Sequence, residues 1–144
     1  MSARALAIVV AGLFGFASAT LAADAKKAEP WAFGKDQFNA RCAACHGVDG
    51  KGHGPAVKQT GMLPPPDLTT YAARNGGTFP AELAWQKIDG RPTGWSEERS
   101  MPVWGRDFRH EAMKNTSYTK NPETYVASEI FALVEYVRGM QVKK

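Results

Sequence analysis

The chain has 144 residues, enough for one small domain and a leader, and a formal net charge of +4. The first 23 residues contain one arginine and no acidic residue, so the rest carries 17 Lys and Arg against 14 Asp and Glu. This mild positive excess argues against a nucleic-acid-binding protein, because such proteins usually show a clustered basic face.

The first 23 residues have the composition of a secretory signal peptide. Arg4 gives a short positive start, residues 5–17 form a continuous apolar run, and small residues follow, with cleavage expected near Ala22 or Ala23. The alternative is an uncleaved membrane anchor, since residues 5–23 approach the roughly 20 residues that a spanning helix needs. The strongly apolar part has the length of a signal peptide. We therefore expect a periplasmic domain over residues 24–144, attached to the membrane only if the leader is retained.

The first half of this domain is predicted to contain one helix followed by irregular chain. Residues 34–45 can form the helix, because Phe38 and both cysteines of the chain fall on one face at helical spacing. Glycines over residues 47–54 then break regular structure, and three prolines at 64–66 force an extended course.

Two further helices are predicted in the second half. A short one covers residues 80–89, with a glycine after it as a stop signal. Residues 91–119 are predicted to be a loop. The clearest helix is the last: Asn121 can cap it, Pro122 fits its first turn, and an apolar stripe continues to Gly139.

The fold class that these elements predict is all-α. No segment shows the strict alternation of a half-buried strand, so we expect three to five short helices joined by long loops. Loops of this length in a compact domain are usually functional, and a cofactor is the obvious thing for them to enclose.

The only two cysteines, Cys42 and Cys45, lie in the sequence CAACH, for which three chemistries are considered. A redox disulfide needs the pair at the start of a helix after a strand, whereas here it ends a predicted helix. Zinc needs four Cys or His ligands, and neither His53 nor His110 belongs to a paired motif. The third is c-type haem attachment, in which both thiols form thioethers to one haem and His46 reaches its iron. This last chemistry uses all three residues of the motif and is the one we expect.

Motifs on both sides of CAACH resemble those of class I single-haem c-type cytochromes. Gly34 and Phe38 stand eight and four positions before the first cysteine, where that family has a glycine and an aromatic residue. LVEY, at residues 133–136, matches the family's Leu-x-x-aromatic pattern on the crossing C-terminal helix. PPDL resembles the family's Gly-Pro-Asn-Leu segment, so the Pro66 carbonyl would accept the second ring N–H of His46. The resemblance covers most of the chain after the leader. It implies a small helical domain wrapped around one covalently bound haem c.

The same resemblance implies the second axial ligand of the iron. The family's distal ligand is a methionine followed by proline and then an aromatic residue, and MPVW begins at Met101. Proline stiffens the loop where the thioether must be held. The other sulfur and imidazole candidates fit less well: Met62, Met113, Met140, His53 and His110.

With His46 and Met101 on the iron no coordination position is open, so the resemblance implies an electron carrier and not an enzyme. Two alternatives stay open. One is a cytochrome c subunit bound tightly within a periplasmic dehydrogenase or terminal oxidase complex. The other is a haem enzyme with an open sixth position.

Charged and aromatic side chains suggest two further contacts, one with a redox partner and one with the haem propionates. Cations near the haem motifs could form a positive rim that steers acidic docking faces of a dehydrogenase or oxidase: Lys51, Lys58, Lys87, Arg91, Arg99 and Arg106. A haem propionate could bind one of Trp85, Arg91 or Trp95, but no spacing selects among them.

Overall fold

The structure is a computed structural model that describes residues 31–90, 101–115 and 117–142. These ranges hold seven α-helices, one 3-10 helix and no strand: α1 (Ala32–Arg41), α2 (Ala43–His46), α3 (Pro55–Thr60), η1 (Leu68–Thr70), α4 (Tyr71–Arg74), α5 (Ala81–Asp89), α6 (Trp104–Lys114) and α7 (Pro122–Gly139). The predicted all-α class is confirmed for the described chain, but three to five helices was too few. The predicted leader and residues 91–100 lie outside the described ranges. None of the described helices is long and apolar enough to span a membrane.

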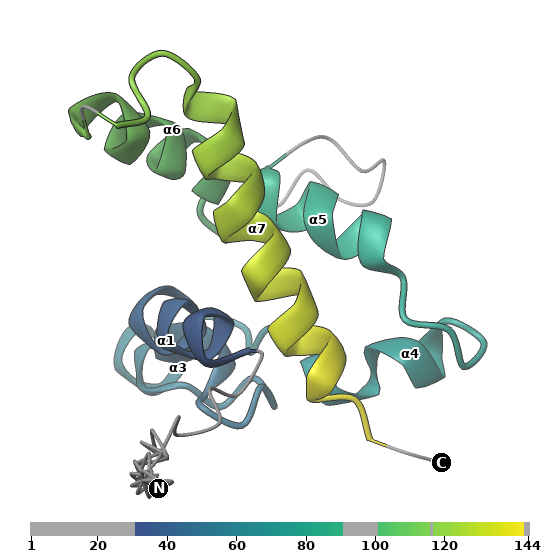
Figure 1. Ribbon diagram of the computed structural model, residues 1–144. Helices are drawn as coiled ribbons and strands as arrows, with labels where there is room; N and C mark the ends of the chain where they lie inside the picture. Colours follow the sequence, from purple (N-terminus) through teal and green to yellow (C-terminus); the bar gives the residue numbers. More distant parts are fainter. Residues whose placement is uncertain (1–30, 91–100, 116, 143–144) are drawn as a thin grey trace, which may run out of the picture.

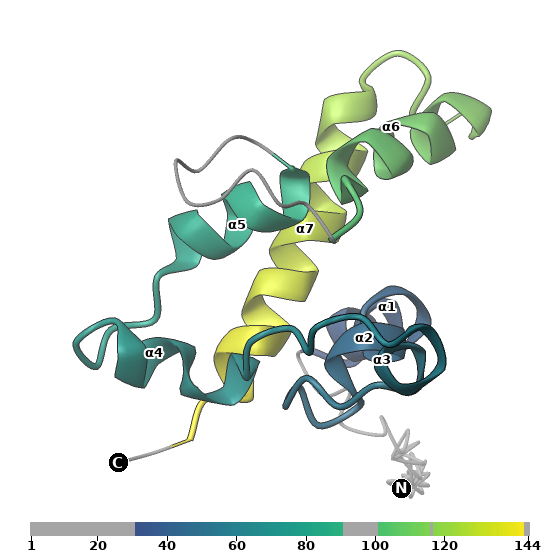
Figure 2. The ribbon, with the colours of Figure 1, turned by 180° about the vertical axis from the view of Figure 1, so that it is seen from behind.

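Helix α7 is the element against which α1, α5 and α6 pack. Figures 1 and 2 show α1 to α3 on one side of it and α4 and α5 on the other, with α6 near its N-terminal end. The local signals for α7 are confirmed: Asn121 Oδ1 accepts a hydrogen bond from the Thr124 N–H at 3.4 Å, and Pro122 occupies the first turn. Its buried stripe consists of Val126, Glu129, Ile130, Leu133, Val134 and Val137.

The predicted first helix is divided in two. Helix α1 ends at Arg41, and Cys42 has φ −105° and ψ −35°, away from regular helical values. The Cys42 carbonyl accepts hydrogen bonds from both the Cys45 and the His46 N–H, at 3.2 and 2.9 Å. This tightened turn separates α1 from α2, so the prediction of one helix over residues 34–45 was wrong at Cys42.

Helix α6 lies within residues 91–119, where a loop was predicted. Its buried face consists of Gly105, Phe108 and Ala112, at positions i, i+3 and i+7 of a helix. Charged residues fill the positions between them, so the apolar stripe is too sparse to stand out in the sequence. Helix α5 and its stop at Gly90, which has φ +86°, are as predicted.

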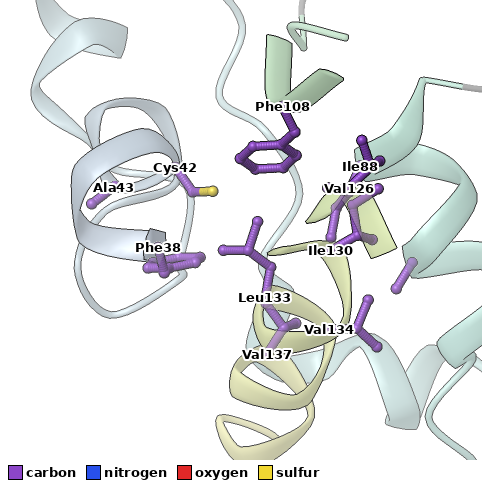
Figure 3. Packing of buried hydrophobic residues seen from close by; sticks show 11 residues of the cluster. Phe38, Cys42, Ala43, Ile88, Phe108, Val126, Ile130, Leu133, Val134 and Val137 are labelled. Carbon is purple, nitrogen blue, oxygen red and sulfur yellow. The ribbon is translucent and has the colours of Figure 1, made fainter. Parts of the chain in front are cut away.

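The α1–α7 crossing forms the centre of the core. A Cβ at Gly34 would overlap the Ala132 carbonyl and lie 3.0 Å from Tyr136 Cβ, so only glycine allows the two helices this close. The Phe38 and Tyr136 rings pack with their centroids 5.3 Å apart. Figure 3 shows Phe38 and Leu133 pointing toward one another, with Phe108 of α6 nearby. This packing fixes Cys42, which directly follows α1.

Candidate functional site

A cavity of ≈ 290 Å³ lies between α1, α5 and α7. Its wall is mostly apolar, with Phe38, Cys42, Pro66, Leu68, Tyr71, Ala84, Ile88, Met101, Leu133 and Val137. Three nitrogen-bearing side chains complete the wall: His46, Arg74 and Lys87. Such a largely apolar wall with a few polar groups is typical of a site for an organic ligand or cofactor.

Three of the four predicted site residues face this cavity. Cys42, His46 and Met101 line it, although Met101 comes from a distant part of the chain. Cys45 is not among the lining residues and is partly exposed on α2. The fold therefore brings the MPVW segment to the same space as the CAACH segment.

The other sulfur and imidazole candidates lie elsewhere. Met113 is 52% exposed on α6, and Met140 packs against the core, where its methyl lies next to Gly50. His53 and His110 are exposed. None of these four residues lines the cavity, and neither does Met62.

The environment of Cys42 does not favour its thiolate form. Burial raises the pKa of the Cys42 thiol to about 12, against a smaller lowering effect of the Arg41 charge. Zinc and redox sites use cysteine as the thiolate. Within the described residues, no group of three or more His, Cys, Asp or Glu side chains could hold a metal ion. Neither observation supports a zinc centre or a reactive thiolate at Cys42.

Comparison with known proteins agrees with this geometry. A family model described as cytochrome c matches residues 32–141, which is most of the chain. The chain belongs to the cytochrome c family. No curated protein and no solved structure matches it. Cys42, Cys45 and His46 match the Cys-x-x-Cys-His attachment motif for haem c, and the family implies haem-based electron transfer with redox protein partners. Most cytochromes c are electron carriers and not enzymes.

The residues around the cavity fit this cofactor. Burial lowers the pKa of the His46 imidazole, which keeps the ring neutral and able to donate a lone pair to a metal. The Nδ1 atom of His46 is buried and has no hydrogen-bond partner among the described residues. The hydrogen bond expected from this ring to the Pro66 carbonyl is therefore absent, although both residues line the cavity. A buried imidazole next to two cysteines and an apolar wall suits a covalently held haem.

In this cytochrome c, backbone hydrogen bonds from the glycine-rich turn after CAACH hold His46 in place. The His46 carbonyl accepts a hydrogen bond from the Gly52 N–H at 2.7 Å, and the Cys45 carbonyl accepts one from the Gly54 N–H at 3.0 Å. Gly52 has φ +84°, and a Cβ on it would overlap the Pro65 carbonyl. Glycine at this position thus lets the turn pack between α2 and the proline segment.

Sequence reasoning missed Arg74 in the cavity wall, and it assigned Lys87 only to the positive rim, whereas both side chains line the cavity. Arg74 Nη2 donates a hydrogen bond to the Asp67 carbonyl at 2.6 Å, and its guanidinium lies 5.5 Å from the centroid of the Tyr71 ring. Arg74 ends α4, a four-residue helix that no sequence signal predicted. Of the propionate candidates considered from the sequence, Trp85 packs against the core without lining the cavity. Arg91 and Trp95 lie outside the described residues.

Proposed function

We propose that this protein is a single-haem electron carrier whose iron is coordinated by His46 and Met101. The observation that supports this most directly is that both side chains line one cavity, beside Cys42. A haem bound here supplies one-electron chemistry at its iron. The roles of the chain are to attach the group through Cys42 and Cys45, to coordinate it, and to exclude water.

Each part of the wall has a role in this proposal. The neutral His46 imidazole and the Met101 thioether would be the two iron ligands that the chain supplies, so that no position would be left for substrate or dioxygen. The apolar side chains disfavour the more highly charged oxidised iron, so we expect a positive reduction potential. Arg74 and Lys87 are the cations in the wall that would pair with the haem carboxylates.

Spectra and mass of the purified holoprotein test this proposal. The intact mass should show one haem added covalently and residues 1–22 or 1–23 removed, because we propose export with cleavage of the leader. Addition of carbon monoxide should leave the reduced spectrum unchanged, because no axial position is open. Rapid binding of carbon monoxide by the wild-type protein would instead indicate a haem enzyme or sensor with an open sixth position.

We also propose that the redox partner docks through an acidic face. Of the cations in the predicted rim, Lys51, Lys58, Lys87 and Arg106 are exposed, whereas Arg91 and Arg99 lie outside the described residues. Charge complementarity of this kind raises association rates by roughly 10-fold to 1,000-fold and is screened by salt.

We therefore expect the bimolecular rate of electron transfer to the physiological partner to fall several-fold as salt is raised. Lys51→Glu should lower the rate at low salt. The matched control is Lys120→Glu in the turn between α6 and α7, which makes the same charge change away from the CAACH segment. A rate that does not respond to salt would contradict acidic docking.

A further inference from the structure

The chain buries a carboxyl group outside the haem cavity. Glu129 lies on the buried stripe of α7 with only 3% of its surface exposed, and its Oε2 atom has no hydrogen-bond partner among the described residues. A buried carboxylate that lacks full compensation is costly. The mechanism proposed above assigns this side chain no role.

The cation whose charge acts on Glu129 is already paired with another carboxylate. Arg41 of α1 donates two hydrogen bonds to the two carboxylate oxygens of Glu111 on α6, at 2.9 and 2.8 Å, and a third to Gln37 at 2.9 Å. Its guanidinium also lies 4.9 Å from the centroid of the Phe108 ring. The charge of this guanidinium also acts on Glu129, but its hydrogen bonds go to Glu111 and Gln37.

The groups around Glu129 come from three helices. Arg41 lies on α1, Glu111 on α6 and Tyr125 on α7, where the Tyr125 hydroxyl donates to Glu111 Oε2 at 3.4 Å. Burial raises the pKa of the Glu129 carboxyl. Tyr125 and Arg41 oppose this shift, and the Glu111 charge adds to it.

Helix α5 also packs against α7. Helix α5 supplies Ala84 and Ile88 to the core. Its Lys87 lines the haem cavity, and its Asp89 lies beside Gly105 and Arg109.

The Glu129 cluster, formed by Arg41, Glu111, Tyr125 and Glu129, borders the wall of the haem cavity from outside. Glu129 precedes the cavity residue Leu133 by one helical turn, and Arg41 directly precedes the cavity residue Cys42. The core side chains Leu133 and Phe108, drawn in Figure 3, are fully buried in this region. In such a poorly solvated region charges are weakly screened, so a charge on Glu129 acts on a charge in the cavity.

We propose that Glu129 is a proton-binding site coupled to the redox state of this protein. The inference rests on the proposed one-electron function. On reduction, one electron enters from the redox partner and Glu129 takes up a proton from solvent; on oxidation, the electron leaves to a partner and the proton returns to solvent. The coupling is reciprocal: the factor by which reduction tightens proton binding is the factor by which the proton favours reduction.

The charge of Glu129 determines whether the reduction potential rises or falls with pH. Deprotonated Glu129 adds a negative charge that stabilises the oxidised state, so its proton affinity is higher in the reduced protein. The reduction potential then falls as pH rises through the range in which Glu129 loses its proton. For a tenfold difference in proton affinity the total fall is about 59 mV, the value of a tenfold change in a one-electron equilibrium.

Redox titrations of the holoprotein across a range of pH test the proposal. The wild-type potential should fall with rising pH by about 59 mV for a tenfold coupling, and Glu129→Gln should remove that fall. The matched control is Glu135→Gln on the same helix, whose carboxylate pairs with Arg138 at the surface and which should keep the wild-type pH dependence. Equal pH dependence in wild type and Glu129→Gln overturns the proposal, and so does a wild-type potential that does not change with pH.

Redox-difference infrared spectra provide a readout that does not depend on potential. Reduced minus oxidised wild-type protein should show the C=O band of a protonated carboxyl that shifts in deuterium oxide, and Glu129→Gln should lack it. If Glu129→Gln yields no folded holoprotein, absence of the band in wild type overturns the proposal. A reversible couple without the pH dependence rejects only this inference, whereas carbon monoxide binding or the lack of a one-electron couple rejects the proposed function.

Discussion

Met101→Ala is expected to open the sixth coordination position of the reduced protein to carbon monoxide. The variant should also lose any sulfur-to-iron charge-transfer band of the oxidised spectrum. Since axial ligands tune haem potentials across about 0.8 V, we expect the reduction potential to fall by on the order of 100 mV. The reason is structural: among the described residues, Met101 is the only methionine that lines the cavity with His46. Absorption spectra with and without carbon monoxide, and a redox titration, measure all three effects.

A control variant separates loss of a ligand from loss of a methionine. Met113 lies on α6, 52% exposed and away from the cavity. Met113→Ala should therefore keep the charge-transfer band and the wild-type reduction potential, and it should not bind carbon monoxide. Survival of the charge-transfer band in Met101→Ala would show that another residue supplies the sulfur. Met62 and Met140 would then be the candidates to test.

The parts of the fold that the sequence predicts well are those with local signals. Asn121 and Pro122 define the start of α7, and Gly90 stops α5, because caps and left-handed glycines act within a few residues. Helix α6 has no cap hydrogen bond from a side chain, and its buried face is formed by tertiary packing. Propensity and pattern could not predict it, because helices of this kind are stabilised mainly by what they pack against.

The candidate site also contains residues that the sequence predicts and residues that only the fold brings together. CAACH is readable because thioether attachment and axial ligation need those residue types in that order, and Met101 follows from a family motif. Arg74 reaches the cavity through the course of the chain in three dimensions, which no spacing encodes. Glu129 did carry a signal, since it stands three residues after Val126 and four before Leu133 on the apolar face of α7. A carboxylate on a buried stripe is an observation that sequence analysis can use.

Gly34→Ala is expected to destabilise the holoprotein, although alanine favours helices over glycine by about 1 kcal/mol. The added Cβ would overlap the Ala132 carbonyl, and backbone on the partner helix cannot rotate away as a side chain can. Overpacking of this kind costs about 1–3 kcal/mol. The displaced α1 would also move Phe38 and the adjacent Cys42, so haem incorporation should fall as well. Urea unfolding of the purified holoprotein and the yield of covalent haem per protein measure the two effects.

Gly139→Ala is the matched control for this substitution. Gly139 is the last residue of α7, and a Cβ on it would have no atom within 4 Å, so the change keeps the gain in helix propensity without the steric overlap. We expect it to leave stability unchanged or to raise it by up to about 1 kcal/mol. The two glycines then give opposite signs for one chemical change, because only Gly34 lies at a helix crossing. If Gly34→Ala were as stable as Gly139→Ala, α1 and α7 would not cross as closely as the structure places them, and the position of Cys42 at the cavity would lose its structural basis.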